Sequence, residues 1–238
     1  MTYRERPPMP PMAGRVACVW ASRQPLVARV KSIVPDGCID LIWSSFDQAV
    51  HVAGPDTGPV EARLRPGEEF AAVRFRPGAA AAVLGLPADA VRDARVPLAE
   101  IWHHDAARIA DLVATAPDRS RVLESLVAER VLSAGPLDRT VAGVVRAVAA
   151  GSPVRSLAAD LGYSERHLRR LCLPAFGYGP KTLHRVLRFQ RAVRLVRAGR
   201  PFGDVAAACG FADQAHLTRE VRALSGRPPS LLAVRQAS

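Results

Sequence analysis

Short apolar runs separated by turn residues dominate the first third of the chain. The runs cover residues 16–20, 33–34, 38–43, 49–53 and 70–75, and the segments between them are rich in Gly, Pro and Asp. Strands of this length with such turns predict a small, mainly antiparallel β domain. Residues 1–14 are rich in proline and are predicted to be a mobile lead-in.

Helical periodicity replaces this pattern after Gly78. Residues 78–84 predict a short helix that ends at Gly85, and residues 105–132 predict two amphipathic helices with a break near Pro117. Gly135-Pro136 predicts a boundary, beyond which every apolar pattern is helical. The expected fold class is therefore α+β, with a mainly β domain and trailing helices at 15–135 and an all-α domain at 136–238.

Two segments of the C-terminal domain repeat one pattern of a short helix, a glycine turn and a second helix. In the segment at about 154–173, Gly162 ends the first helix in a left-handed conformation and Ser164 caps the second. In the segment at about 203–224, Gly210 and Asp213 occupy the matching places. Each segment predicts a helix-turn-helix unit whose second helix can lie in a DNA major groove.

A single long helix is predicted between the two units, at about 180–197. About 17 helical residues span roughly 26 Å at 1.5 Å per residue. A rigid spacer of about this length suits two recognition helices that lie about one DNA turn, roughly 34 Å, apart on one face of the duplex.

Positive charge is concentrated in the same half of the chain. Residues 139–238 contain 17 Lys and Arg against 5 Asp and Glu, whereas residues 1–138 contain 16 against 17. A basic domain joined to a neutral one is expected of a nucleic-acid reader attached to a sensor or assembly domain.

Several other classes of protein are disfavoured by the sequence. The chain has neither an apolar run long enough to span a bilayer nor the apolar stretch of a signal peptide, so no membrane association and a cytoplasmic location are expected. Its four cysteines lack metal-site spacing, so neither a metal nor a cofactor is implied. Because no phosphate loop, catalytic triad or carboxylate pair stands out, the protein is not expected to be an enzyme.

The motifs of the C-terminal domain resemble a known family. They are residues 157–168 around Gly162, residues 177–181 with 188–192, residues 205–219 around Gly210-Phe211, and residues 226–230. In this order they are similar to the signature of AraC/XylS-type transcription regulators over about 100 residues. The chain departs from that signature at Leu171-Cys172, where an aromatic residue is usual, and at Pro174, where a basic residue is common.

The resemblance implies which side chains read DNA. The positions that match the base-reading faces of the family are Arg166, Arg169, Arg170, Gln214, Ala215, His216 and Arg219. Arginine can pair in a forked fashion with guanine, whereas Ala215 offers at most a contact to a thymine methyl. The expected phosphate contacts are Ser164, Arg188, Arg191 and Arg194.

The N-terminal domain is similar, around residues 35–43 and 74–78, to an uncharacterised domain found in front of such DNA readers. This resemblance implies no ligand. Cys38, Trp20 and Trp43 are the candidate effector-sensing residues, although burial as core residues is the favoured explanation for each of them.

The expected function is sequence-specific transcription regulation, as activator or repressor, with double-stranded DNA as the partner. RNA polymerase, a small-molecule effector and a second copy of the chain remain open as further partners, and the amphipathic stretch 105–132 is the candidate dimer contact. An architectural DNA-coating protein is the first alternative. A DNA-repair alkyl-transfer regulator is the second, but it requires an upstream four-cysteine metal cluster, and residues 1–138 hold only Cys18 and Cys38.

Overall fold

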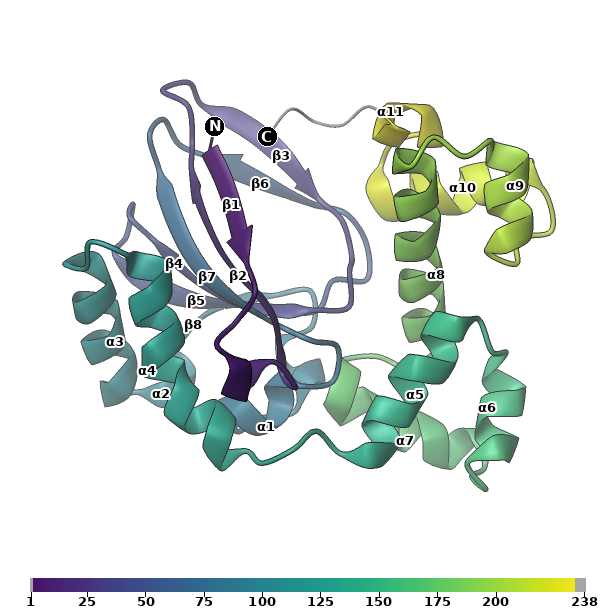
Figure 1. The fold of residues 1–238 in the computed structure, drawn as a ribbon, viewed down its shortest axis with the longest axis horizontal. Coiled ribbons are helices and arrows are strands. Elements are labelled where there is room, and N and C mark those ends of the chain that lie inside the picture. Colours follow the sequence, from purple (N-terminus) through teal and green to yellow (C-terminus); the bar gives the residue numbers. More distant parts are fainter. Residues whose placement is uncertain (1, 234–238) are drawn as a thin grey trace.

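A computed structural model describes residues 2–233, with strands in the N-terminal half and helices in the remainder (Figure 1). The α+β class predicted from the sequence is confirmed. The strands are β1 (Thr2–Arg6), β2 (Val16–Arg23), β3 (Arg29–Ile33), β4 (Ile39–Ser44), β5 (Ala49–Ala53), β6 (Val60–Leu64), β7 (Glu69–Phe75) and β8 (Arg95–Pro97). The apolar runs thus form β2, β4, β5 and β7, whereas β1, β6 and β8 lie outside the predicted runs.

Antiparallel pairing joins the strands into two sheets. The larger sheet has six strands in the order β1-β2-β7-β4-β5-β8, and the smaller sheet consists of β3 and β6. Because side chains alternate across a strand, Leu41 and Trp43 of β4 point into the core, whereas Asp40 and Ile42 lie on the opposite face. The larger sheet therefore has one apolar face and one face with polar side chains.

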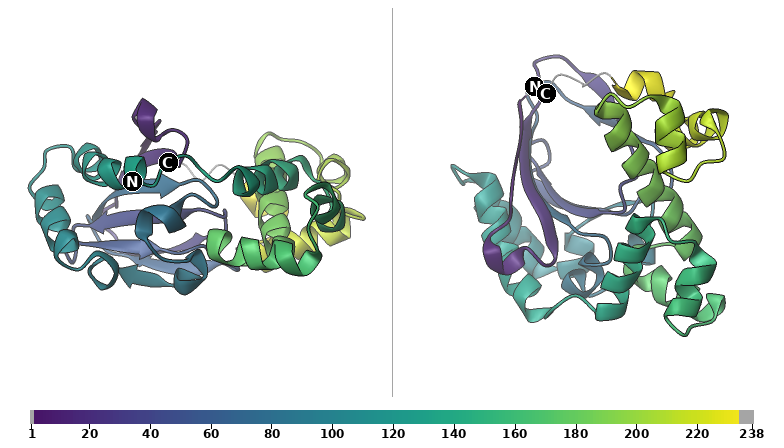
Figure 2. Two further views of the ribbon diagram at one scale, coloured as in Figure 1. Left: turned by 90° about the horizontal axis from the view of Figure 1, so that it is seen from below. Right: turned by 45° about the vertical axis from the view of Figure 1, so that its right-hand side comes forward.

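Helices cover the apolar face. They bury a core around Val73, Leu123 and Val127, and the last two of these helices lie on the side of the sheet away from the C-terminal helices (Figures 1 and 2). The helix pair predicted around Pro117 is confirmed, and its apolar side is used for this packing. The elements are α1 (Ala80–Leu84), η2 (Ala88–Val91), α2 (Ala99–Trp102), α3 (His104–Ala114) and α4 (Arg119–Ser133).

The N-terminal segment is not the mobile lead-in that its prolines predict. Residues 2–6 form β1, which pairs along β2 from Thr2 opposite Arg23 to Arg6 opposite Val19. After the prolines, Met12 at the end of η1 (Pro10–Met12) is 1% exposed in the main core. The prolines shape this segment, but strand pairing and the burial of Met12 fix it to the domain.

Two separate apolar cores hold the C-terminal helices together. Leu183 and Val186 of α8 belong to the first core, which includes α5, α6 and α7, whereas Phe189 and Val193 belong to the second, which includes α9 and α10. Of the helices in residues 2–233, none is both long and apolar enough to cross a membrane. The helices are α5 (Arg139–Ala150), α6 (Val154–Asp160), α7 (Glu165–Phe176), α8 (Pro180–Arg197), α9 (Phe202–Ala208), α10 (Gln214–Ser225) and α11 (Pro229–Ala233).

Arg15 anchors the segment that connects the two halves. Its guanidinium donates hydrogen bonds to the carbonyls of Ala134, Gly135 and Pro136 at 2.7–2.9 Å and to that of Ala79 at 3.0 Å. Because three of these acceptors are the carbonyl oxygens of residues 134–136, at the domain boundary proposed at 135/136, one buried side chain fixes the path of the chain between the halves.

Candidate nucleic-acid interface and β-domain cavity

The first helix-turn-helix unit is built from α6, a tight turn and α7. Gly162 takes the left-handed conformation, with φ at 66°, and the Ser164 hydroxyl accepts a hydrogen bond from the backbone N–H of His167 at 3.1 Å. Leu168 is fully buried beneath α7. The turn and the cap fix where α7 begins, and Leu168 fixes which face of the helix points outward.

The second unit repeats this construction with α9 and α10. Gly210 has φ at 71°, and the Asp213 carboxylate accepts from the backbone N–H of His216 at 2.6 Å. Leu217 is fully buried, as Leu168 is in the first unit. The glycines, caps and buried leucines of the two units thus correspond in order, with the cap and the leucine of the second unit one residue further from the glycine.

The outward faces of α7 and α10 carry most of the predicted reading residues. Within residues 2–233, no carboxylate forms an ion pair with any of the four arginines on these faces, so their guanidinium groups are available to an outside acceptor. The exposed members of the set are Arg166, Arg169, Arg170, Gln214, Ala215 and Arg219.

Of the predicted reading residues, Arg170 has one guanidinium nitrogen 3.3 Å from the Nδ1 of His167, and His216 is also partly engaged within the protein. Its Nδ1 accepts from the backbone N–H of Ala212 at 3.3 Å, and its ring stands edge-on to Phe211 at 5.3 Å between centroids. A neutral His216 therefore carries its proton on Nε2, which leaves one donor for an outside group.

Arg188 does not take the role of phosphate contact that the sequence predicts. Its side chain is only 20% exposed, lies 4.4 Å from the ring centroid of Phe211 and approaches Glu220 at 3.7 Å. Arg185 reaches the same carboxylate at 2.8 Å. Arg188 is drawn inward because α8 and α10 pack together, so it braces the second unit against the linking helix.

Glu220 is the acidic partner that sequence analysis missed. Burial raises the pKa of its carboxyl, but the hydrogen bond and charge of Arg185, with the charge of Arg188, outweigh that effect and hold the pKa below its ordinary value. Of the other predicted phosphate contacts, Arg194 is exposed, Arg191 is half-buried, and the Ser164 hydroxyl serves as the helix cap.

A cavity of about 500 Å³ lies between the polar face of the larger sheet, β3–β6 and the C-terminal helices. Trp20, Cys38 and Arg74 line it from the larger sheet, and Lys31 lines it from β3. The helical half contributes lining residues too, among them Gln190, Arg197 and Arg227. Both halves of the chain therefore contribute walls to one cavity.

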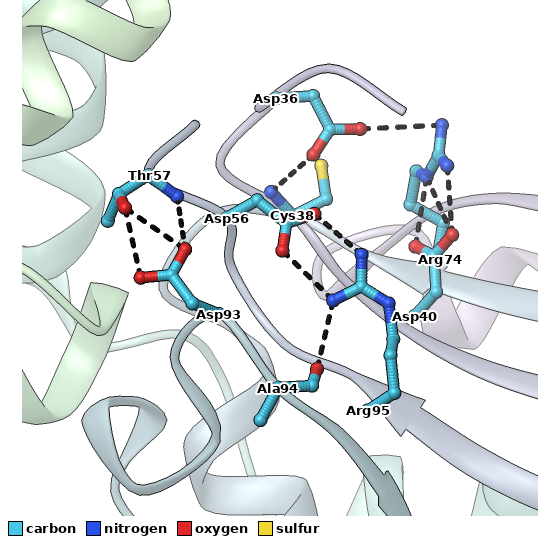
Figure 3. Close-up of polar contacts among 9 residues, drawn as sticks. All are labelled: Asp36, Cys38, Asp40, Asp56, Thr57, Arg74, Asp93, Ala94 and Arg95. Atoms are coloured by element: carbon cyan, nitrogen blue, oxygen red, sulfur yellow. Dashed lines mark hydrogen bonds and ion pairs between the residues drawn. The ribbon is translucent and has the colours of Figure 1, made fainter. Parts of the chain in front are cut away.

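Buried ion pairs occupy one end of this cavity (Figure 3). Arg74 donates two hydrogen bonds to Asp40 at 2.8–2.9 Å, and the Trp20 indole N–H donates to the same carboxylate at 3.1 Å. Arg95 pairs in the same forked manner with Asp56, at 2.7 and 2.9 Å. The proximity of Asp36 and Asp40 to Cys38 was visible in the sequence, but their pairing with Arg74, more than thirty residues later, was not.

The three candidate sensor residues have different surroundings. Trp20 and Cys38 line the cavity, whereas Trp43 is 2% exposed in the core, with the Arg119 guanidinium 5.1 Å from its ring centroid. The sensor role predicted for Trp43 is therefore wrong, because strand alternation turns its ring to the apolar face. Burial, with the charges of Asp36 and Asp40, raises the pKa of the Cys38 thiol well above its ordinary value, so Cys38 is not a thiolate near neutral pH.

Besides the hydrogen bond of Arg15 to Pro136, three hydrogen bonds among residues 2–233 join the N-terminal domain to different parts of the helical half. Arg92 donates to the carbonyl of Gly177 at the end of α7 at 3.1 Å, and the Gln190 amide in α8 donates to the carbonyl of Pro35 at 2.5 Å. The Ser32 hydroxyl donates to the carbonyl of Ser225 at the end of α10 at 3.4 Å. The N-terminal domain thus contacts both helix-turn-helix units and the helix between them.

Comparison with known families matches the two halves separately. Residues 157–234 match a family described as a helix-turn-helix domain, and residues 4–97 match a domain of unknown function, DUF6597. A probable bifunctional transcriptional activator/DNA repair enzyme AlkA from Mycobacterium tuberculosis is 39% identical over 103 residues, which are 41% of this chain and 21% of the relative. The chain thus spans about a fifth of the length of the curated relative that it matches.

Two solved structures of ToxT align with most of this chain. The crystal structure of ToxT from Vibrio cholerae O395 gives a TM-score of 0.49 at 10% identity, covering 92% of this chain and 98% of that chain. A structure of wild-type ToxT from Vibrio cholerae strain SCE256 with bound unsaturated fatty acid gives a TM-score of 0.42 at 9% identity, covering 87% and 94%.

Proposed function

From the premise that residues 157–234 are a helix-turn-helix domain of the AraC type, we propose that the chain is a sequence-specific transcription regulator. Each molecule binds two adjacent major-groove segments of double-stranded DNA, one with α7 and one with α10. The observation that carries this proposal is that the two units share a glycine turn, a helix cap and a buried leucine in the same order, each with an exposed polar face on its second helix.

Geometry and charge support this proposal. At 1.5 Å per residue, the 18 residues of α8 span about 27 Å between the two units. The net charge of +12 on residues 139–238 supplies the electrostatic attraction to phosphate that every DNA reader needs. Arg166, Arg169, Arg170 and Arg219 then read base edges, assisted by Gln214, Ala215 and His216, while Arg191 and Arg194 contact phosphate.

The N-terminal domain modulates this reading. Its contacts with Gly177, Gln190 and Ser225 support this part of the proposal, because a change in its structure would act on them and alter the relative position of α7 and α10. A small-molecule effector in the cavity between the halves would act on the contacts of Gln190 and Ser225, which line it. RNA polymerase and a second copy of the chain are further partners that this organisation allows.

Alkyl transfer from DNA is not the function that the cysteines support. Burial raises the pKa of Cys18 to about 12 and, similarly, that of Cys172 to about 12, and Cys209 is also shifted upward by burial. A thiol must ionise to act as the nucleophile in such a reaction. These raised pKa values favour the regulatory proposal over alkyl transfer to a cysteine.

Selection of bound sequences from a random duplex library tests the proposal. The wild-type chain is expected to select a motif of two segments about one turn apart, and Arg169→Ala and Arg219→Ala are each expected to relax one segment by about 1–3 kcal/mol of discrimination. If no motif emerges and both variants weaken binding uniformly, the architectural alternative replaces this proposal.

Arg194 and Arg188 offer a matched pair for separating DNA contact from structural support. Arg194→Gln is expected to weaken binding to all sequences and to lower the salt slope of binding by about one. Arg188→Gln is expected instead to reduce stability by about 1 kcal/mol, because it removes an ion pair and a ring contact that hold α8 to α10. Fluorescence anisotropy over a salt series and urea unfolding measure the two effects. A larger change in salt slope for Arg188→Gln than for Arg194→Gln would contradict the assignment.

A further inference from the structure

The carboxylates at one end of the cavity differ in how well they are paired. Asp40 and Asp56 each receive a forked pair of hydrogen bonds from an arginine, whereas Asp36 does not. One oxygen of Asp36 accepts from the backbone N–H of Cys38 at 2.9 Å, and the other lies 3.5 Å from the nearest Arg74 nitrogen (Figure 3). Asp36 therefore retains a carboxylate oxygen without a close donor among the described residues.

The balance of charge around Asp36 favours a cation from outside. Three carboxylates share two guanidinium groups at this end of the cavity, and Arg74 is committed to Asp40. Burial raises the pKa of Asp36, and the charge of Arg74 opposes that shift. A cationic group that entered the cavity would compensate the remaining negative charge of Asp36.

Cations without carboxylate partners also line the cavity, from β3 and from the helical half. Within residues 2–233, none of the ion pairs involves Lys31, Arg197 or Arg227, all of which line the cavity. Burial and the nearby positive charges of Arg29 and Arg74 lower the pKa of Lys31, as expected for an ammonium group without an acidic neighbour. These three cations favour the binding of an anionic group in the cavity.

Apolar and polar groups between the charged residues suit a ligand of moderate size. Trp20 and Tyr3 lie 5.8 Å apart between ring centroids, and Phe70 lines the same wall. Gln24, which is 6% exposed, also lines the cavity, and its Oε1 has no hydrogen-bond partner among the described residues. A volume of about 500 Å³ lies within the range of small-molecule sites.

We propose that this cavity binds a small amphoteric molecule, meaning one that carries both a cationic and an anionic group. Its cationic group pairs with Asp36, and its anionic group is held by Lys31 and Arg227. The effector role of this ligand rests on the proposed regulatory function, whereas its binding does not.

The position of Asp36 and Arg227 explains how such a ligand would affect the helices. Asp36 follows Pro35, whose carbonyl accepts from Gln190 of α8, and Arg227 lies two residues after Ser225, whose carbonyl accepts from Ser32. A ligand that holds Asp36 and Arg227 at once therefore binds next to two of the hydrogen bonds between the halves. Its occupancy stabilises one relative position of the two helix-turn-helix units.

Calorimetric titration of the full chain with matched compounds tests the proposal. The probes are ω-aminoalkanoic acids of increasing length, each compared with the alkanoic acid and the alkylamine of the same length. Phenylalanine-containing dipeptides, compared with their N-acetylated and C-amidated forms, provide an aromatic series. In at least one series the doubly charged compound is expected to bind about tenfold or more tightly than either singly charged one.

Variants of the two charged ends sharpen this test. Asp36→Asn keeps an oxygen that can accept from Cys38 and is expected to weaken binding of the amphoteric probe about tenfold, while the alkanoic acid binds as before. Arg227→Gln is expected to do the reverse, weakening the amphoteric probe and the alkanoic acid while sparing the alkylamine. Glu61→Gln and Arg63→Gln, exposed on β6 and outside the cavity lining, are the matched controls and are expected to change nothing.

The comparison of probes on the wild-type chain tests the proposal even if a variant fails to fold. The proposal is overturned if the alkanoic acid or the alkylamine binds as tightly as the amphoteric probe of the same length. It is also overturned if no compound of either series binds. Sequence selection on DNA is scored separately. Tight amphoteric binding without a DNA motif would overturn the proposed regulatory function and leave the ligand site in place.

Discussion

Alanine in place of Gly54 is expected to destabilise the N-terminal domain by at least about 3 kcal/mol. A Cβ atom at this position would lie 1.6 Å from the carbonyl oxygen of Val91 and 2.6 Å from its carbonyl carbon. These are backbone atoms, so no side-chain rotation relieves the contact. The Gly54 N–H also donates to the carbonyl of Ala94 at 3.0 Å, which holds the end of β5 against the same segment. Urea unfolding monitored by circular dichroism measures the loss.

Gly58 provides the control within the same loop. A Cβ atom there meets nothing within 4 Å, and its φ lies outside the left-handed region, so Gly58→Ala is expected to leave the free energy of unfolding within about 0.5 kcal/mol of wild type. If Gly54→Ala unfolds at the same urea concentration as Gly58→Ala, the result would contradict the close packing of Gly54 against the backbone of Val91.

Local signals account for the parts of the fold that the sequence predicts well. The two recognition helices were predictable because Gly162 and Ser164, or Gly210 and Asp213, specify a turn and a cap within a few residues. The strand β6 was missed although residues 60–64 alternate strictly between apolar and charged side chains, because the run is only five residues long and includes Glu and Ala, which are uncommon in strands. It becomes a strand by pairing with β3, whose residues are about thirty positions away.

Orientation was harder to predict than the presence of an element. In β4, four of the five residues from Ile39 to Trp43 are apolar, so sequence alternation does not show which face is buried. The covering helix α4 decides, by placing Arg119 over the Trp43 ring. Arg188 was assigned to the surface for a similar reason, because its partner Glu220 lies on a separate helix and is absent from any local pattern.

The charged cavity could not be derived from the sequence because it depends on contacts between distant segments. Its acidic residues come from the turn before β4, from β4 and from the loop after β5, whereas Arg74 comes from β7 and Arg227 from the segment after α10. Each of these residues alone resembles an ordinary surface charge. Their chemistry arises only when the sheet and the helical half are brought together.

The two cores along α8 imply that the helix-turn-helix units can fail separately. Leu217→Ala is expected to cost about 2–5 kcal/mol, because Leu217 is fully buried in the core that holds α9 and α10 to the second half of α8. Leu168 lies in the other core, so the first unit is expected to stay folded. Hydrogen exchange should show lost protection in α9 and α10 with protection in α7 retained.

The mirror variant and a surface variant complete this experiment. Leu168→Ala should shift the loss of protection to α6 and α7, whereas Leu231→Ala, at a leucine that is 56% exposed, should change the free energy of unfolding by less than about 0.5 kcal/mol. Equal loss of protection over both units in either core variant would mean that they form one cooperative body. If the two units unfold separately, α8 is a rigid connection between two small domains. The N-terminal contacts at Gly177 and Ser225 then each act on one unit. An effector can therefore reposition one recognition helix relative to the other.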